Sequence, residues 1–389
     1  MSSRRRSPNL ISLVVLAIVI AVAGYVYRQG QEPTPAPTAP ATQAAPGQPT
    51  PAESAMPAWL HVFFTNPNPP DQSGSGVDQV ILPLIQSATQ SIDVTSFDLN
   101  LPDLVNALAD AQKRGVIVRV VYDGTNGEQK LDNAATNNKT FDAIKTLKAA
   151  GVGLVNGGRS NGLMHDKIVI IDGKTLLMGS WNLSYNDTYR NNNNLLEITA
   201  PQLIANYQAK FNELFVDKRF GAKAEIGALA PSLTLDGVRV ENYFSPTDQV
   251  MAHLVQTVQG AKRSVHVMIF TFTDPGLASA LIERAKAALD VQGVIEDRGA
   301  SQGALPTLFC AHLPFKTDGN KYTMHHKVIV IDGQTVITGS FNFTKSADTA
   351  NDDNLIILHS PAVAALYEQE YQQINAAGQL PQAAGFQCP

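Results

Sequence analysis

The chain has 389 residues, of which 44% are hydrophobic and 16% are charged, so it is long enough to build one large core or two fused halves. Its 34 acidic residues outnumber 29 basic ones, which gives a net charge of −5 and a pI ≈ 5.9. No basic run follows the N-terminal segment, so the electrostatic footprint of a processive nucleic-acid-binding protein is missing.

Residues 1–28 predict a membrane anchor or a signal segment. Three arginines at positions 4–6 precede a nearly continuous apolar run, Leu10–Tyr27. This pattern favours a single uncleaved span that leaves the rest of the chain outside the cytoplasm. The alternative is a secreted protein cleaved after Ala23, because Ala-x-Ala behind an apolar segment can be a signal-peptidase site.

Composition predicts how the remaining chain is divided. Residues 29–58 are rich in Pro, Ala, Thr and Gln, which is typical of an extended linker. We expect a first half at 59–221, a hinge of small residues at 222–236 and a second half at 237–389.

Strands and helices alternate in both halves. The first half predicts a helix near 77–90, a strand at 91–97, a helix from Pro102 to Gly115, a strand at 116–122 and a helix at 141–150. The second predicts a helix near 248–260, a strand at 264–272, a helix at 276–289 and a strand near 291–296. An amphipathic helix closes each half. The expected fold class is α/β, with two fused α/β sandwich halves, each a mixed sheet flanked by helices, related by a pseudo-twofold axis.

One stretch occurs twice. Met164–Gly173 is followed by Gly179–Asn182, and Met324–Gly333 is followed by Gly339–Asn342. The two copies keep a constant offset of 160 residues, which continues well past the stretch itself. The chain therefore carries a duplicated unit.

Each copy predicts a β-hairpin that gathers polar side chains. With a two-residue turn at 173–174, Lys167 falls opposite Ser180 and His165 falls opposite Asn182, all on one face. The equivalent pairs of the second copy are Lys327 with Ser340 and His325 with Asn342. The same four residue types are thus expected to converge twice.

These residue types suit a phosphate. Lysine supplies a positive charge, asparagine and serine supply hydrogen-bond donors, and histidine can attack or transfer protons near neutral pH. Two facing copies offer a nucleophile and a general acid. We interpret Asp172 and Asp332, at the turns, as structural supports, and His326 as pointing away from the site.

Other interpretations of the motif are weaker. A lone His-x-Lys with a later Asp arises by chance, but two copies with identical following residues do not. Metal binding is disfavoured because His-x-Lys lacks a second ligand at a usual spacing and its cation repels a metal, so we predict no metal and no cofactor. A module that holds phosphate without turnover is disfavoured because both histidines are intact.

The pattern His-x-Lys-(x)4-Asp-(x)6-Gly-Ser-x-Asn resembles the signature of the phospholipase D superfamily, and the duplication resembles its two-motif members. The resemblance covers residues 60–377 in organisation and is specific over 163–215 and 323–375. Residues 339–344 are most similar to the small bacterial nuclease branch. The resemblance implies a metal-independent, two-step phosphodiester exchange through a phosphohistidine, with one monomer sufficient for a complete site.

The resemblance also implies unequal halves. Relatives of the small nuclease usually carry an acidic residue 28 positions after each motif histidine, where this chain has Asp353 in the second half and Asn193 in the first. In two-motif relatives that carboxylate reaches across the axis, so Asp353 would orient His165 as the nucleophile. His325, facing Asn193, would be the general acid. The alternative is that Asp353 is a solvated loop residue.

The substrate stays open between classes. Membrane tethering favours phospholipid head groups, which the protein would hydrolyse or transfer, whereas the motif favours nucleic acid. We place the phospholipid first, an exported or membrane-tethered endonuclease second, and a cardiolipin-synthase-like phosphatidyl transferase third. The loops expected to decide are 123–162 and 298–322. Cys310 and Cys388 are either incidental or a disulfide that holds the C-terminal tail.

Overall fold

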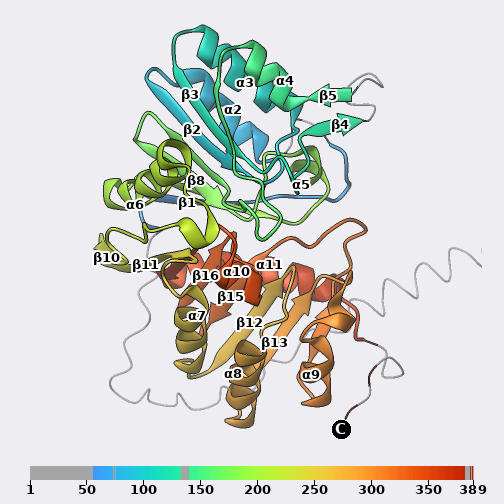
Figure 1. The fold of residues 1–389 in the computed structure, drawn as a ribbon. Coiled ribbons are helices and arrows are strands. Elements are labelled where there is room, and N and C mark those ends of the chain that lie inside the picture. The colour runs from blue at the N-terminus through green and yellow to red at the C-terminus, as the bar shows by residue number, and fades with distance from the viewer. Residues whose placement is uncertain are drawn as a thin grey trace, which may run out of the picture. The chain divides into compact units, whose positions relative to one another are not determined.

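The computed structural model describes residues 56–381 except 73, 75 and 133–139, together with residues 386 and 388. Within that part of the chain two large sheets carry the architecture (Figure 1). Helices flank both sheets, which confirms the predicted α/β class with two sandwich halves. The domain boundaries expected at residues 221 and 236 stay a prediction, although strand β10 (Ser232–Leu235) falls inside the proposed hinge.

The first sheet contains seven strands. Their order is β1 (Leu60–Phe64), β9 (Asn194–Ile198), β8 (Thr175–Gly179), β7 (Ile168–Ile171), β2 (Ser91–Ser96), β3 (Ile117–Tyr122) and β6 (Gly153–Asn156). Strands β2, β3 and β6 run parallel and the other neighbours pair antiparallel. One face is covered by α2 (Asp78–Ser87), α3 (Pro102–Lys113) and α4 (Ala143–Ala149), and the other by α6 (Pro201–Asn212).

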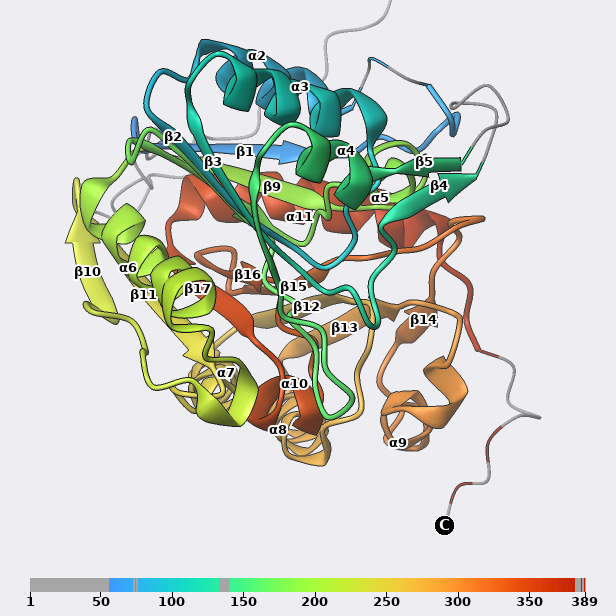
Figure 2. The same cartoon turned by 45° about the horizontal axis from the view of Figure 1, so that its top comes forward.

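The second sheet contains eight strands. Their order is β10, β11 (Val238–Ser245), β17 (Asp353–His359), β16 (Thr335–Gly339), β15 (Lys327–Ile331), β12 (Ser264–Ile269), β13 (Asp290–Ile295) and β14 (Phe315–Thr317). Helices α7 (Val250–Gln259), α8 (Pro275–Lys286) and α9 (Leu305–Cys310) cover one face, and α11 (Pro361–Ala377) covers the other. In both views α8 and α9 lie at the lower edge of the molecule (Figures 1 and 2).

Short elements complete the described chain. They are the strand pair β4 (Lys130–Asp132) and β5 (Thr140–Asp142), the helices α5 (Tyr185–Tyr189) and α10 (Lys345–Thr349), the π-helical turn η2 (Glu213–Asp217), and the 3-10 turns η3 (Gly221–Lys223) and η4 (Ala300–Gln302). Helices α5 and α10 each follow one copy of the repeated motif, at the same offset of 160 residues.

A single apolar cluster joins the two halves. Tyr207 of α6 packs against Phe244 of β11, with ring centroids 5.1 Å apart, and Tyr367 of α11 packs against Phe64 of β1 at 5.0 Å. Each aromatic pair therefore links a helix of one half to a strand of the other, and Figure 2 shows α11 passing close to β1. The burial of apolar side chains from both halves in this one cluster favours a fixed arrangement of the two motif hairpins.

The predicted hairpin register is wrong by one residue. Ile171 pairs with Thr175, so the turn contains three residues, of which Asp172 and Gly173 have φ of 51° and 63°. The second hairpin has the same pairing, Ile331 with Thr335. The sequence favoured a two-residue turn because that loop is common, but an aspartate in the left-handed region makes the longer one possible here.

The polar side chains nevertheless reach one region, because each return strand ends at a glycine that breaks the alternation of faces. Gly179 has φ 154°, and a Cβ there would lie 2.4 Å from the carbonyl oxygen of Asn194. Gly339 repeats this with φ 140° and a 2.3 Å approach to Asn354. Only glycine fits this close backbone contact, and the residues after it are redirected toward the motif strands.

The predicted location, anchored by a single N-terminal span with the catalytic part outside the cytoplasm, is contradicted. No helix among the described residues combines the length and apolar character needed to cross a bilayer. Even the 17-residue α11 carries Glu368 and Glu370. The apolar run 10–27, the possible cleavage site after Ala23 and most of the predicted linker lie outside the described residues.

The two cysteines form a disulfide. Cys310, at the end of α9, is bonded to Cys388 in the C-terminal tail, and the rings of Phe309 and Phe386 pack beside it with centroids 5.1 Å apart. The bond therefore holds the described part of the tail on α9, and the cysteines are not incidental.

Candidate active site

The two motif strands are each held by a loop from the other half. The backbone N–H of His165 donates to the carbonyl oxygen of Asp352 at 3.0 Å, and that of His325 donates to Asn192 at 2.9 Å. Because each acceptor directly precedes the position 28 residues after a motif histidine, the crossed backbone pairing brings those positions to the opposite histidine.

The side chains repeat the crossed pairing. The Nδ1 atom of His165 lies 2.6 Å from Oδ1 of Asp353, and Nδ1 of His325 lies 2.9 Å from Oδ1 of Asn193. Both acceptors lack a proton to give, so each Nδ1–H donates and each Nε2 keeps a lone pair. Asp353 is fully buried, so it is not a solvated loop residue.

A serine supports each of these acceptors. The Ser340 hydroxyl donates to Oδ1 of Asp353 at 2.7 Å, and the Ser180 hydroxyl donates to Oδ1 of Asn193 at 2.9 Å. The serines predicted to contact a phosphate therefore bind the groups that orient the histidines. The two serines therefore influence the histidines through Asp353 and Asn193.

The two lysines are buried beside the histidines. Lys167 and Lys327 are 2% and 1% exposed, and each ammonium donates to the carbonyl oxygen of the histidine two residues earlier, at 2.7 Å. Burial lowers the pKa of Lys167 and lowers that of Lys327 well below its usual value. An ammonium can donate three hydrogen bonds, so an anion in the site would stabilise both charged forms.

The histidines are shifted in the same direction. Burial, followed by the charge of Lys167, lowers the pKa of His165, although Asp353 opposes the shift. Burial, followed by Lys327 and Lys167, lowers the pKa of His325 well below its usual value. Each lysine thus acts on the histidine of the other copy as well as its own, which indicates that the two copies form one electrostatic site. Both imidazoles are neutral when that site is empty.

The two motif asparagines have different surroundings. Asn182 accepts a hydrogen bond from the backbone N–H of Asp98 at 3.3 Å and donates through Nδ2 to Asp187 at 2.7 Å. The Oδ1 atom of Asn342 is buried and has no hydrogen-bond partner among the described residues. The side chain of Asn182 is therefore held by two hydrogen bonds, whereas Oδ1 of Asn342 is available to accept one from another molecule.

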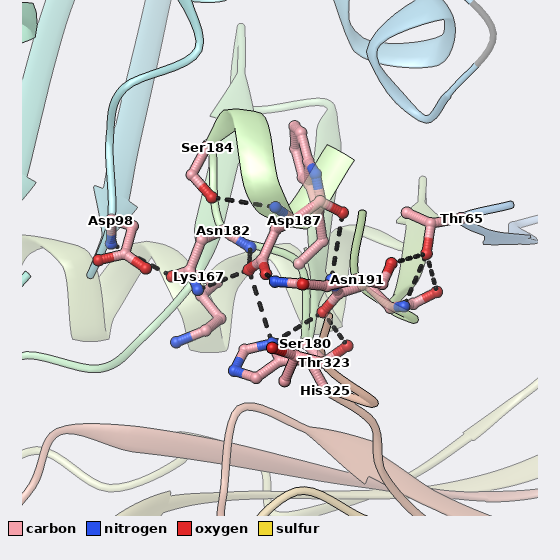
Figure 3. A network of polar contacts seen from close by, with 12 residues as sticks. Thr65, Asp98, Lys167, Ser180, Asn182, Ser184, Asp187, Asn191, Thr323 and His325 are labelled. Atoms are coloured by element: carbon pink, nitrogen blue, oxygen red, sulfur yellow. Dashed lines mark hydrogen bonds and ion pairs between the residues drawn. The ribbon is translucent and has the colours of Figure 1, made fainter. Parts of the chain in front are cut away.

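Two carboxylates of the site were missed from the sequence. Asp98 and Asp187 lie close to Lys167 and Asn182 in Figure 3. Burial raises the pKa of Asp98 to about 7. A comparison of the two copies would have found Asp187, because the matching position of the second copy is Ala347, and a charge present in one copy only is a signal.

Other predicted positions lie outside this cluster. The carboxylate of Asp172 accepts hydrogen bonds from the backbone N–H groups of residues 89–91, which holds its pKa at about 2 despite partial burial. Asp332 accepts from the N–H groups of residues 262–264 in the same way. His326 points to the opposite side, where its Nε2 lies 3.1 Å from Glu370.

In the part of the chain that the structure describes, no group of three or more His, Cys, Asp or Glu side chains is arranged to hold a metal ion. The expected absence of a metal or cofactor stays a prediction. The charge that a metal would supply has an alternative source in Lys167 and Lys327.

Comparison with known proteins places the chain in a family. Residues 81–215 and 254–375 match the family described as cardiolipin synthase, PLD-like domain. A mitochondrial cardiolipin hydrolase of Xenopus laevis is 32% identical over 130 residues, which cover 33% of this chain and 62% of that protein. A phospholipase D of Rickettsia prowazekii (strain Madrid E) is 31% identical over 134 residues, which cover 34% and 65%. The match thus spans less than two thirds of these relatives' length.

A solved structure shares the fold over most of the chain. The phosphatidylserine synthase of Haemophilus influenzae Rd KW20 superimposes with a TM-score of 0.64 and 13% identity, over 83% of this chain and 87% of that one. Because the family model matches more than half of the residues, in two copies that each contain one His-x-Lys motif, the chain belongs to the phospholipase D superfamily.

Proposed function

We propose that this protein hydrolyses the head-group phosphodiester of a phospholipid through a covalent phosphohistidine. The observation that supports it most is the crossed pairing of His165 with Asp353 and of His325 with Asn193. It brings two imidazoles, whose Nε2 atoms have no hydrogen-bond partner in the described part of the chain, into a site that also contains two buried lysines.

In the first step Nε2 of His165 attacks phosphorus and the bond to the head-group oxygen breaks. The leaving oxygen takes a proton from Nε2 of His325, so the head group departs as an alcohol. The carboxylate of Asp353 stabilises the positive charge that forms on His165. Lys167 and Lys327 bind the phosphoryl oxygens, whose negative charge is most spread in the transition state.

In the second step water replaces the head group. Neutral His325 removes a proton from the water, whose oxygen attacks phosphorus as the bond to Nε2 of His165 breaks. The products are a phosphatidic acid and the regenerated neutral His165, and His325 holds its proton again.

The low pKa of His325 fits this cycle once substrate is considered. An empty site keeps His325 neutral, because burial and two lysines oppose its charge. A bound phosphodiester adds a negative charge near the same atoms and raises the pKa of the imidazole. Substrate binding therefore favours the protonated form of His325, which is the form that acts as the general acid.

The substrate class rests on the relatives. Two proteins that are 32% and 31% identical over 33% and 34% of this chain are named cardiolipin hydrolase and phospholipase D. The net charge of −5 also disfavours general binding of a polyanionic strand by this chain. Both features favour a small phosphodiester at a lipid head group over nucleic acid.

The test presents the purified full chain, with chelator present, to vesicles containing cardiolipin and other phospholipids, to single- and double-stranded nucleic acid, and to vesicles with an added alcohol. We expect phosphatidic acid to be released from vesicles, and the H165A and H325A variants to release none. Cleavage of nucleic acid alone would overturn the substrate, and transfer to the alcohol in preference to water would overturn hydrolysis. Turnover of no phosphodiester would overturn the whole proposal.

A further inference from the structure

The two histidines have neighbours of the same shape but different charge. His165 donates to a carboxylate, Asp353, and His325 donates to an amide, Asn193. A serine hydroxyl donates to the same oxygen in both cases. The geometry is repeated, and the negative charge is not.

A carboxylate lies beside His325 all the same, but on a different element. Oδ2 of Asp187, on α5, is 3.5 Å from Nδ1 of His325, and Figure 3 shows Asp187 directed at that ring. Asp187 is 3% exposed. The counterpart helix α10 has Ala347 at the matching position. The first half thus carries its carboxylate on the helix, and the second half carries it at the strand end.

A supporting asparagine donates a hydrogen bond to the carboxylate in each half. Asn351 donates through Nδ2 to Oδ2 of Asp353 at 3.3 Å. Its counterpart Asn191 donates through Nδ2 to Oδ1 of Asp187 at 2.6 Å. These two equivalent amides have different targets because the charge lies in a different place, which indicates that Asp187 occupies the role that Asp353 has in the other half.

We propose that Asp187 is the positioning residue of His325, a carboxylate relocated from position 193 to helix α5, which stabilises the charged imidazole of the general acid. The proposal rests on the function proposed above, in which His325 delivers a proton. A carboxylate at 3.5 Å stabilises a cation less than one in a 2.6 Å hydrogen bond, so the arrangement leaves His325 able to give up its proton.

Burial and the charges around His325 both oppose a positive charge on this imidazole, which a nearby carboxylate would offset. Lys327, Lys167, His165 and His326 all oppose a positive charge on this imidazole. Asp187 lies 3.5 Å from Nδ1 of this imidazole, where its charge would offset them, and it favours the charged forms of Lys167 and Lys327. Without it, the charged acid would face two cations and a neutral amide.

The decisive variants remove the charge and then restore it at the other position. D187N keeps the size of the side chain, and D187N/N193D places the carboxylate of the first half at the position where the second half has Asp353. We expect kcat to fall at least tenfold in D187N, with KM within about twofold, and to recover most of that loss in the double variant. Full activity in D187N, or a double variant that recovers none of the lost activity, would overturn the proposal, and thermal unfolding of both variants shows whether a loss of structure is the cause.

A readout without turnover separates this inference from the proposed function. The pKa of His325 is measured by NMR on the full chain, with its resonances assigned from H325Q. D187N should lower that pKa by about 1, and D187N/N193D should return it to or above the original value. The matched control is D348N, which removes a carboxylate from α10 that accepts from the N–H of Met251 and should leave His325 unchanged. Equal values in all variants overturn the role of Asp187, even if the wild type proves inactive on every phosphodiester.

Discussion

His165 and Asp353 are 188 residues apart in sequence, yet Nδ1 of the histidine lies 2.6 Å from a carboxylate oxygen that is fully buried. This contact distinguishes the two histidines, because at the equivalent position His325 contacts the amide oxygen of Asn193. The predictions below depend on this inequality.

The covalent intermediate should form on His165. Its carboxylate partner stabilises the charge that the imidazole gains when it attacks phosphorus. Rapid quenching with substrate, proteolysis and mass spectrometry should locate the phosphoryl group on the peptide containing residue 165. The group should accumulate in H325A with a substrate whose leaving group needs no proton. A phosphohistidine at 325 would reverse the assigned roles.

Replacing Asp353 by Asn should lower kcat by up to about 10⁴-fold, the loss typical of a carboxylate removed from behind a catalytic histidine. The amide can keep the contacts with Ser340 and His165, because Asn193 makes equivalent ones with Ser180 and His325. Thermal unfolding controls for structure. A D353N variant that keeps more than half of its activity would show that the carboxylate charge has no part in the reaction.

The pH profile should lie on the acid side of the usual histidine range. Both imidazoles have lowered pKa values, so a charged His325 becomes appreciable in the free protein only at a pH below the usual histidine range. We therefore expect kcat/KM to peak below pH 6.5, because this parameter reports the free enzyme. Binding of inorganic phosphate should take up a proton, which calorimetry in two buffers of different ionisation enthalpy can measure. An optimum above pH 7, or binding without proton uptake, would contradict the assignment.

Asp166 should make the protein less stable as pH rises. Burial raises its pKa to about 7, and only one of its carboxylate oxygens has a partner among the described residues, the Nδ2 group of Asn354. A raised acid pKa means that the folded state holds the proton longer than the unfolded state, so stability is lost between about pH 4 and pH 7. The neutral D166N variant escapes this loss. Its advantage over the wild type should grow by about 3 kcal/mol between pH 5 and pH 8 in urea unfolding.

Asp172 provides the opposite case for comparison. Backbone N–H groups hold its pKa at about 2, so its contribution to stability is present above about pH 4 and is lost as pH falls toward 2. D172N should therefore be less stable than the wild type at pH 8. If both variants shifted stability in the same direction at that pH, the assigned protonation states would be wrong.

The repeat made much of the fold and the site predictable. The alternation of helices and strands gave the two sandwich halves, and a shared spacing of His, Lys, Ser and Asn located the cluster. Strands β9 and β17, which begin at Asn194 and Asp353, were not predicted, because their short apolar runs lack a clear turn signal. The register failed because loop length depends on which residue adopts positive φ, and Asp172 does so against the usual preference for glycine.

Asp187 shows a different limit of sequence patterns. Motif spacing identifies residues that occur in both copies. Asp187 occurs in one copy only, because the matching position of the other copy is Ala347. The contact with His325 joins a short helix in one half to a strand start in the other. Such contacts depend on how the halves pack, through aromatic pairs such as Tyr207 with Phe244, which local periodicity does not encode.

The crossed pairing has a consequence for how such a protein can diverge. In a symmetric dimer of two identical chains, the residues at positions 193 and 353 would be encoded by a single codon, and both histidines would share one neighbour. Fusion of the two copies removes that constraint. Each half then supplies the side chain that contacts the histidine of the other half. A substitution at position 193 or 353 therefore changes the reactivity of the histidine in the other half and leaves the contact of the histidine in its own half unchanged.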